Sequence, residues 1–418
     1  MSRAAVVTGI GVVAPNGLGT DAYWSATRDG RSGIGPISRF DPAGYPVRLA
    51  GQVDDFDVDE HLPRRVVVQT DHWTHLALTA ADMALADAAV TPTQLPEYDM
   101  AVVTASSSGG TEFGQREIER LWSKGPQHVT AYQSIAWFYA ASTGQISIRH
   151  GMRGPCGVVA TEQAGGIDAI GHARRALRTG TRLVVTGGTD ASLCPYGLVA
   201  QLSTGRLSRR ADPARAYVPF DLRACGYVPG EGGAILIVED AEHAAQRGAP
   251  RVYGEIAGYA ATFDPRPGTG RPPGLRRAIT QALADAGVRA DEVDVVFADG
   301  AGVPDLDRAE AGVLTEVFGP RAVPVTVPKT MTGRLYAGLS LDVVAALLAI
   351  RDGVIPPAVG IRHPVPEHEL DLVVGACRET TVRTALVLAR GYGGFNAALV
   401  VRGRPRNNVR GGDNDHSR

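Results

Sequence analysis

Apolar and polar positions along the chain alternate between two kinds of segment. Runs of four or five residues rich in Val, Ile and Leu predict buried strands, and longer Ala-rich stretches with amphipathic spacing predict helices. The predicted strands are residues 4–7, 100–104, 183–186, 234–238, 293–297, 323–327, 385–388 and 397–401. The predicted helices are residues 71–88, 112–122, 166–177, 274–286, 305–318 and 339–350. Strands that alternate with helices indicate an α/β fold.

Two segments of similar design indicate an internal duplication. The sequence GEGG at residues 230–233 leads into an apolar strand, and GYGG at residues 391–394 leads into another. Strand–turn–helix units also recur around Gln163 and Lys329. We therefore expect an N-terminal half at residues 1–245 and a C-terminal half at residues 246–403. The polar stretch 404–418, with Pro, Gly, Asn and Asp, predicts a disordered tail.

Composition and charge narrow the class of protein. Hydrophobic residues make up 44% and charged residues 21% of the 418, which is typical of a soluble globular chain. The formal net charge of −2 gives no electrostatic reason to expect nucleic acid or an anionic membrane as a partner. No run of about 18 apolar residues predicts a membrane span. The four cysteines form no CxxC pair, which favours a reduced, cytoplasmic setting and no metal site.

The segment VVATEQAGGID, residues 158–168, has the pattern of a strand, a tight turn and a helix. Several enzymes present a nucleophile at such an elbow, because the turn exposes a side chain and the helix N-terminus stabilises an anion there. The residue at the tip is Gln163, whose amide does not ionise and is a poor nucleophile.

Four motifs together resemble those of the β-ketoacyl synthases, over residues 3–403. They are VVTGIGVVAPNG at 6–17, the elbow at 158–168, PFD at 219–221 with GEG at 230–232, and GYGGFN at 391–396. The resemblance implies the thiolase fold, a duplicated five-layered α/β/α/β/α unit that works as a dimer. It also implies that Gln163 replaces a catalytic cysteine, and that Asp299 in DGAGV and Arg334 in KTMTGR replace two catalytic histidines. A carboxylate at position 299 would repel a developing oxyanion.

These replacements resemble one subgroup, the chain length factors or KSβ subunits of type II aromatic polyketide synthases. Glutamine within ATEQAGG is its mark, and the segments at 136–139 and 144–151 also look like that subgroup. The resemblance implies a non-condensing subunit in a heterodimer with a catalytic ketosynthase that retains the cysteine and both histidines. A phosphopantetheinylated acyl carrier protein would bring malonyl units, and the poly-β-ketone would grow in a tunnel at the interface. No cofactor bound by this chain is implied.

Gln163 itself allows two interpretations. Its amide either bridges a buried turn without any chemistry, or it mimics a bound thioester and assists decarboxylation of malonyl carrier protein, which would prime the synthase. An independent hydrolase or condensing enzyme with a shifted nucleophile is disfavoured, because no Ser-His-Asp or Cys-His spacing supports it.

Other charged residues match supporting positions of the family. Lys329 is expected to pair with Glu310 in a buried site, with Asp307 nearby. Asp299 and Arg334 are expected to form a second pair, which would replace two neutral histidines by one ion pair. Buried pairs of this kind position loops more than they stabilise a fold.

Thr111, Gly114 and Ile118 follow one another along one side of the helix predicted at 112–122. In the chain length factors this region lies near the subunit interface and shapes the end of the tunnel. The small to medium size of the three residues predicts a deep tunnel and a long chain, and ordinary helix packing is the alternative.

Two further groups have structural interpretations. His72 and His75 are spaced i, i+3, but no further metal ligand accompanies them, so we expect surface or packing roles. Cys156 precedes the elbow strand and is expected to be a buried structural thiol. Cys225 has no pattern that supports a catalytic role.

Overall fold

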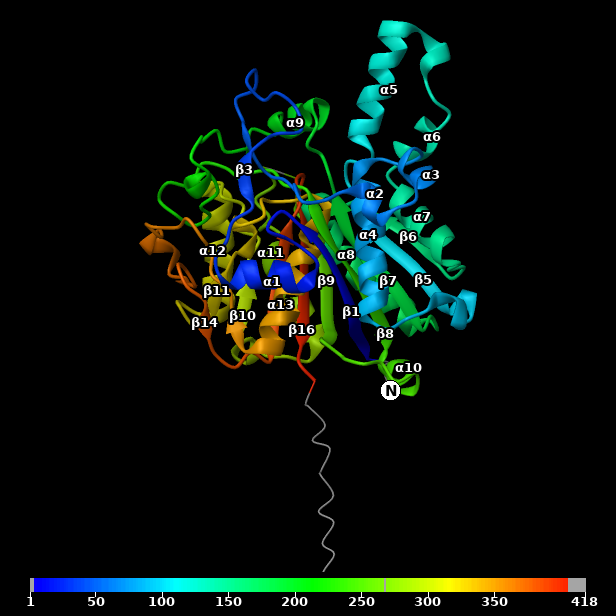
Figure 1. Cartoon of the computed structure of the whole chain (residues 1–418). Helices are drawn as coiled ribbons and strands as arrows, with labels where there is room; N and C mark the ends of the chain where they lie inside the picture. Colours follow the sequence, from blue (N-terminus) through cyan, green and yellow to red (C-terminus); the bar gives the residue numbers. More distant parts are fainter. Residues whose placement is uncertain (1–3, 267, 405–418) are drawn as a thin grey trace, which may run out of the picture.

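The computed structural model describes residues 4–266 and 268–404, so the predicted tail lies outside the described residues except for Arg404. These residues form a twelve-stranded sheet, and Figure 1 shows it in the middle of the molecule. Its strands are β1 (Ala5–Ala14), β2 (Gly17–Leu18), β5 (Met100–Ala105), β6 (Cys156–Val159), β7 (Leu183–Asp190), β8 (Gly232–Asp240), β9 (Gly254–Phe263), β10 (Val295–Phe297), β11 (Pro324–Thr326), β13 (Asp371–Leu372), β15 (Thr384–Arg390) and β16 (Phe395–Arg402).

Two pairs of short strands lie outside this sheet, and thirteen α-helices accompany the strands in the described part of the chain. The short strands are β3 (Ile34–Pro36) with β4 (Leu49–Gly51), and β12 (Val354–Ile355) with β14 (Arg378–Glu379). The helices are α1 (Thr20–Arg28), α2 (Val58–His61), α3 (Arg64–Val67), α4 (His72–Asp87), α5 (Thr111–Lys124), α6 (Gln133–Ala136), α7 (Ala141–His150), α8 (Gly165–Arg178), α9 (Pro195–Leu202), α10 (Ala241–Gln246), α11 (Leu275–Ala286), α12 (Pro304–Phe318) and α13 (Ser340–Asp352).

The strand order confirms the predicted duplication. One half of the sheet has the order β6-β5-β7-β8-β1 and the other β11-β10-β15-β16-β9, so the order of strands by sequence is the same in both. The directions match as well, with two parallel pairings followed by two antiparallel ones in each half. The halves join where β1 meets β9, with Val6 opposite Glu255. The predicted boundary at residue 245 falls in α10, between β8 and β9, and the division into halves stays a prediction.

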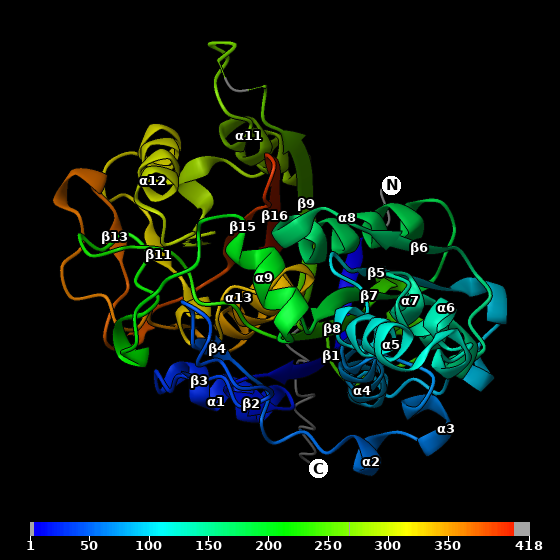
Figure 2. The ribbon, with the colours of Figure 1, turned by 90° about the horizontal axis from the view of Figure 1, so that it is seen from above.

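Three of the four apolar cores of the described chain lie between the layers of the fold. Helices α4 and α7 pack on the outer face of one half of the sheet, and α11 and α12 pack on the outer face of the other. Helices α8 and α13 contribute to the third core, which lies between the two halves. Figure 2 shows α8 and α13 in the middle, with α4 on one side and α11 and α12 on the other. The α/β/α/β/α arrangement expected from the sequence is therefore present.

Strand β1 continues to Ala14, past the two glycines at positions 9 and 11. Helix α4 approaches this strand closely. A Cβ atom at Gly9 or Gly11 would overlap the carbonyl oxygens of Ala84 and Ala80 in α4. The two glycines therefore let the helix lie directly on the strand, and they do not end it.

All six predicted helices are present, with their ends shifted by at most two residues. Strand β9 and helices α1, α7 and α9 are among the elements that were not predicted. The buried and less buried positions of β9 follow no regular alternation, and α9 has only eight residues, so neither has a strong periodic signal. In the described part of the chain, no helix is long and apolar enough to span a bilayer.

Candidate functional site

The elbow predicted around Gln163 is present. Strand β6 ends at Val159, a short 3-10 turn covers Glu162–Ala164, and α8 begins at Gly165. The helix can start this close to the other half because Gly166 packs against the Ala337 carbonyl oxygen, where a Cβ atom would lie only 2.6 Å away. The side chain of Gln163 is buried at the tip of this turn.

Gln163 hydrogen-bonds to the glycine-rich turn between β15 and β16. The backbone N–H of Tyr392 donates to Gln163 Oε1 at 3.0 Å. In glutamine the amide carbon is bonded to Cγ, as the carbonyl carbon of an acylated cysteine is bonded to its sulfur. The amide oxygen therefore takes the place of a thioester oxygen. The Tyr392 N–H donates to it as a backbone donor of an oxyanion hole would donate to a thioester oxygen. This geometry is compatible with both interpretations of Gln163, the bridging and the mimicking one.

Asp299 and Arg334 form the predicted ion pair. Asp299 follows β10, and Arg334 lies in the loop before α13; both side chains are buried. Arg334 Nη2 lies 2.8 Å from each carboxylate oxygen of Asp299 and also donates to the Arg390 carbonyl oxygen at 2.5 Å. The guanidinium carbon lies 5.2 Å from the centre of the Tyr227 ring, which adds a cation–π contact.

The charge of Asp299 is fully committed to this pair. Burial opposes its ionisation, but the positive charges of Arg334 and Lys329 outweigh burial and leave its pKa below the usual value. The backbone N–H of Arg390 also donates to Asp299 Oδ1 at 2.9 Å. A carboxylate held in this way neither accepts a proton near neutral pH nor stabilises a developing oxyanion.

Lys329 does not pair with Glu310, and that prediction was wrong. Its ammonium Nζ lies 2.6 Å from Asp342 Oδ2 and donates to the Ala298 carbonyl oxygen, also at 2.6 Å. Glu310 instead accepts hydrogen bonds from the backbone N–H groups of Asp299 and Gly300, at 2.7 and 2.9 Å. Two backbone donors already satisfy the Glu310 carboxylate, and the first turn of α13 presents a carboxylate to the lysine.

Glu310 and Asp307, both in α12, hold the loop that carries Asp299. Burial raises the pKa of Glu310, and the charge of Asp299 raises it further. Asp307 accepts from the backbone N–H groups of Phe220 and Gly302, each at 2.9 Å. Burial raises the pKa of Asp307 to about 7. Glu310 and Asp307 are thus both close to Asp299, as expected. Their carboxylates hold backbone N–H groups in place.

A cavity of about 470 Å³ lies next to these groups. Arg334, Arg390 and Tyr392 line it on the side of the site. No thiol, histidine or hydroxyl of a Ser–His type pair lines it among the described residues. The arrangement can therefore hold a carbonyl compound by hydrogen bonds, but it has no nucleophile for acyl transfer.

The three proposed tunnel residues lie on α5, which Figure 1 shows projecting from the body of the molecule. Thr111 and Gly114 are buried, and Ile118 is 52% exposed. A Cβ atom at Gly114 would lie 2.8 Å from Cδ1 of Trp137, so the indole fills the space that the glycine leaves. Nothing in the sequence connects Trp137 with Gly114, because the two residues belong to different segments that meet only in the folded chain.

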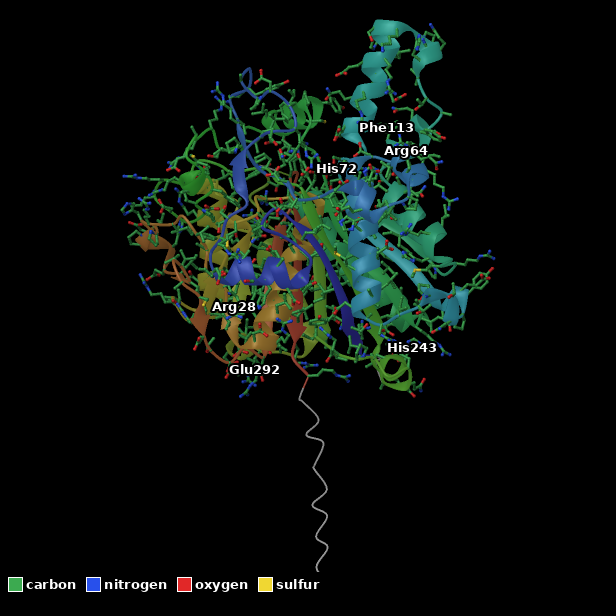
Figure 3. All side chains as sticks on the ribbon, in the orientation of Figure 1. Arg28, Arg64, His72, Phe113, His243 and Glu292 are labelled. Carbon is green, nitrogen blue, oxygen red and sulfur yellow. The ribbon has the colours of Figure 1, made fainter. Side chains whose placement is uncertain are left out.

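The base of α5 is attached to the start of α4, and Figure 3 shows Phe113 and His72 close to this junction. Asp71 caps α4 by accepting from the Trp73 N–H, and it also accepts from the Phe113 N–H at 2.7 Å. His72 lies 3.7 Å from Glu231, and burial lowers the pKa of His75 to about 4. These contacts agree with packing roles for the two histidines.

The prediction of a buried Cys156 was wrong. The residue opens β6, which lies at the edge of the sheet and pairs with β5 alone, and its side chain is exposed. Cys225 is exposed too, with its sulfur 3.5 Å from Ser208 Oγ. Within residues 4–266 and 268–404, no three His, Cys, Asp or Glu side chains are grouped to hold a metal ion.

Sequence comparison places this fold and site in a known class. Residues 2–244 match the N-terminal domain of the beta-ketoacyl synthase family, and residues 253–362 match its C-terminal domain. The chain belongs to the beta-ketoacyl synthase family.

Within that class, the similar proteins are polyketide synthase subunits. The ketoacyl synthase beta subunit of the tetracenomycin polyketide synthase from Streptomyces glaucescens is 62% identical over 399 residues, which cover 95% of this chain and 98% of the relative. The solved ishigamide ketosynthase/chain length factor has a TM-score of 0.88 at 29% identity and covers 97% of this chain and 100% of its own. A type II acyl carrier protein complex with its hexaketide-bound ketosynthase (AntDE:AntF) has a TM-score of 0.85 at 27% identity, with coverage of 97% and 100%.

Proposed function

We propose that this chain is a chain length factor, the non-condensing beta subunit of a type II aromatic polyketide synthase. The observation that carries the proposal is Gln163 at the tip of the elbow, with its amide oxygen bound by the Tyr392 N–H. An amide there cannot accept an acyl group, and the buried Asp299–Arg334 pair leaves no general base in the site. Condensation must therefore take place on another chain.

That other chain is a catalytic ketosynthase. The exposed surface around α5 supports a protein partner, because large apolar side chains gather on it and in the segment that follows. They are Ile118, Leu121, Trp122, Ile135, Trp137, Phe138 and Tyr139. The side chain of Trp122 is 83% exposed. Exposure of so large an apolar side chain to water is unfavourable unless a partner covers it. The resemblance to a solved ketosynthase/chain length factor supports the same kind of partner.

The finer parts of the proposal concern the substrate. A phosphopantetheinylated acyl carrier protein brings malonyl units to the partner, and the similar carrier protein complex supports this. The poly-β-ketone grows in a tunnel between the two subunits, and Thr111, Gly114 and Ile118 contribute to its end. We also propose a cytoplasmic setting, in agreement with four cysteines that form no disulfide.

The test is reconstitution with a catalytic ketosynthase of the same type. We expect the two chains to copurify as a heterodimer, and the heterodimer to make polyketide from malonyl carrier protein. The purified chain alone should release no carbon dioxide from malonyl carrier protein, before or after Gln163→Ala. Release that Gln163→Ala abolishes would support the decarboxylase function instead, and a stable homodimer that ignores the ketosynthase would contradict the heterodimer.

A further inference from the structure

Asp71 joins two helices at their N-terminal ends. It is the N-cap of α4, where its Oδ1 accepts from the Trp73 N–H at 3.1 Å, and its Oδ2 accepts from the Phe113 N–H of α5 at 2.7 Å. Phe113 is the third residue of α5, so its N–H is one of the backbone donors that a helix leaves unpaired in its first turn. One carboxylate therefore caps two helices.

The burial and the charge of Asp71 fit this double role. Its side chain is fully buried, and burial raises its pKa to about 6, although the N–H groups of Phe113 and Trp73 oppose the rise. At pH 7.5 the carboxyl is therefore mostly ionised, so both of its oxygens accept hydrogen bonds. The N-terminal ends of the two helices also stabilise a negative charge at this point.

Helix α5 touches the body of the molecule only near its start. Figure 1 shows the rest of the helix projecting away from the sheet. Its buried residues all belong to the first two turns, and they are Thr111, Phe113, Gly114 and Glu117. The direction in which α5 projects is therefore decided by the contacts at its base.

The bond to Asp71 is the link between the α5 backbone and the body. Of the described residues outside 109–140, Asp71 alone hydrogen-bonds to the backbone of α5. Glu117 accepts from the Thr130 N–H at 2.6 Å, but Thr130 belongs to the segment that leads back from the far end of α5. The Gln115 side chain accepts from the Tyr196 N–H at 2.9 Å on the exposed surface. Asp71 thus provides the buried attachment.

The other side of the link is held firmly in place. Helix α4 lies directly on β1, because Gly9 and Gly11 leave no side chain between them, and most of its residues are buried. Gly110 lets α5 start against Asp71, since a Cβ atom at position 110 would lie 3.0 Å from Asp71 Cβ and 2.0 Å from the Ala136 carbonyl oxygen. Asp71 therefore attaches α5 to a helix that is itself fixed on the sheet.

Helix α5 is long enough to convert a small tilt into a large displacement. Its 14 residues span about 21 Å at a rise of about 1.5 Å per residue. A tilt of about 10° at the base would move the far end by about 4 Å and Ile118, half-way along, by about 2 Å. Displacements of this size are similar to the length of one two-carbon unit of a polyketide.

We propose that Asp71 is a positioning residue for chain length: its carboxylate holds α5 at one tilt, and this tilt sets the depth of the tunnel end that Thr111, Gly114 and Ile118 form. Asp71 touches no substrate, and it acts through the Phe113 N–H and the helix that follows. This inference rests on the proposed function, since it requires a polyketide tunnel at α5.

Asp71→Ser separates the two caps. A serine hydroxyl is a good N-cap and can still accept from the Trp73 N–H, but it is too short to reach Phe113 in another helix. In the reconstituted heterodimer at pH 7.5, hydrogen exchange of residues 111–117 should become at least tenfold faster, whereas residues 76–85 of α4 should exchange as before. Unchanged exchange at residues 111–117 would overturn the inference.

The product distribution of the same heterodimer tests the functional step. A helix that is free to tilt should give a tunnel of variable depth, so products other than the main chain length should increase at least threefold in share with Asp71→Ser, as measured by mass spectrometry. A loss of stability alone would lower the total yield without changing this share. Faster exchange at α5 with an unchanged share would therefore also contradict the proposed role of Asp71.

Asp240→Ala is the matched control. Asp240 is also buried and also accepts from two backbone N–H groups, those of Glu242 and His243 at 3.1 and 3.2 Å, as the N-cap of α10. Figure 1 shows α10 at the opposite end of the molecule from α5. The control should lower the melting temperature without changing the product distribution, and a similar broadening in both variants would exclude a specific role of Asp71.

Asp71→Asn is the second variant, in case the serine variant does not assemble. An asparagine has the size of the aspartate but only one acceptor oxygen, so it can cap one of the two helices and not both. Exchange at residues 111–117 and the share of other chain lengths should both rise, by less than with serine. A variant with the exchange and products of the unmodified heterodimer would show that the double cap is not needed.

The outcomes distinguish this inference from the proposed function. Failure of the unmodified chain to form a heterodimer, or to make any polyketide with an active ketosynthase, contradicts the proposed function itself. Exchange of the purified chain then still decides whether Asp71 holds α5. A working heterodimer in which both Asp71 variants behave like the unmodified protein leaves the proposed function intact and excludes the positioning role.

Discussion

The side-chain oxygen of Gln163 accepts a hydrogen bond from the backbone N–H of Tyr392 at 3.0 Å, and this bond joins the two halves of the duplicated fold. Gln163 belongs to the turn after β6, and Tyr392 to the turn between β15 and β16. The contact explains why a glutamine at this position has a structural use even though it cannot act as a nucleophile.

We predict that Gln163→Ala lowers the free energy of unfolding by about 1–3 kcal/mol, because it leaves the partly buried Tyr392 N–H without an acceptor. Gln163→Glu keeps an acceptor oxygen at the same position and should cost less. Urea unfolding followed by circular dichroism measures both. Equal losses for the two variants would show that the hydrogen bond to Tyr392 contributes little.

The Asp299–Arg334 pair should show strong coupling. Arg334→Met leaves a buried carboxylate without its partner and should lower the free energy of unfolding by about 3–5 kcal/mol. Asp299→Asn in the Arg334→Met background should recover part of that loss, since it removes the uncompensated charge. A double-mutant cycle by urea unfolding gives the coupling energy, and additive losses would contradict a direct interaction.

Lys329 should couple to Asp342 and not to Glu310. Lys329→Met is expected to lower the free energy of unfolding less when Asp342 is also changed to Asn. The reason is that Lys329 Nζ and Asp342 Oδ2, which lie 2.6 Å apart, compensate each other's charge. The matched control is Glu310→Gln, which removes a similarly buried carboxylate that bonds to backbone N–H groups. Stronger coupling with Glu310 than with Asp342 would support the pairing that was expected from the sequence.

Trp137 should control the room available beside α5. Its indole lies where a side chain at Gly114 would extend, so Gly114→Phe is expected to displace it and to lower the melting temperature. Trp137→Ala should open this space and shift the products of the heterodimer toward longer chains, as measured by mass spectrometry. Gly114→Phe with Trp137→Ala should restore stability, and an unchanged product profile in all three would contradict a tunnel at α5.

Stability should rise as the pH is lowered from 8 to 5. Burial raises the pKa of Asp168 to about 6, and a carboxyl whose pKa is raised in the folded state contributes stability that is complete below the unfolded value near 4 and is lost as the pH rises through about 6. The shift of about two pH units corresponds to about 2–3 kcal/mol. Asp168→Asn can retain the contacts with Thr161 and Tyr259 and should flatten the dependence of the urea midpoint on pH.

Several carboxyls contribute to the pH dependence of stability in the same direction. Asp168→Asn removes the contribution of one of them. Burial also raises the pKa of Asp71 to about 6 and that of Asp307 to about 7. Asp299 acts in the opposite direction, since Arg334 lowers its pKa, and its contribution is lost only as the pH falls through its lowered folded-state value, below the usual range of a carboxyl. A urea midpoint that is highest at pH 8 would contradict this balance.

The pattern of apolar positions was sufficient to predict the main elements and the duplication. Strands and helices repeat apolar positions with different periods, and these periods can be read from local sequence. The predicted ends of helices α4, α5, α8, α11, α12 and α13 therefore lie within two residues of the observed ends. The elbow was also predictable, because a strand, a small-residue turn and a helix follow one another directly. The motifs were sufficient to locate Gln163, Asp299 and Arg334. The opposite charges of Asp299 and Arg334 then predicted their ion pair.

The tertiary structure alone decided which groups meet across the fold. Asp342 lies within an apolar helix, and nothing in its neighbourhood in the sequence connects it with Lys329; the packing of α13 between the two halves brings the charges together. The same holds for Trp137 beside Gly114, for the strained backbone of Glu162 and for the exposed Cys156 at a sheet edge. The sequence determined which elements form and which residues stand at the tip of the elbow and in the two loop motifs, because those properties are local. Pairing, strain and exposure depend on how distant elements pack, and only the folded chain decides them.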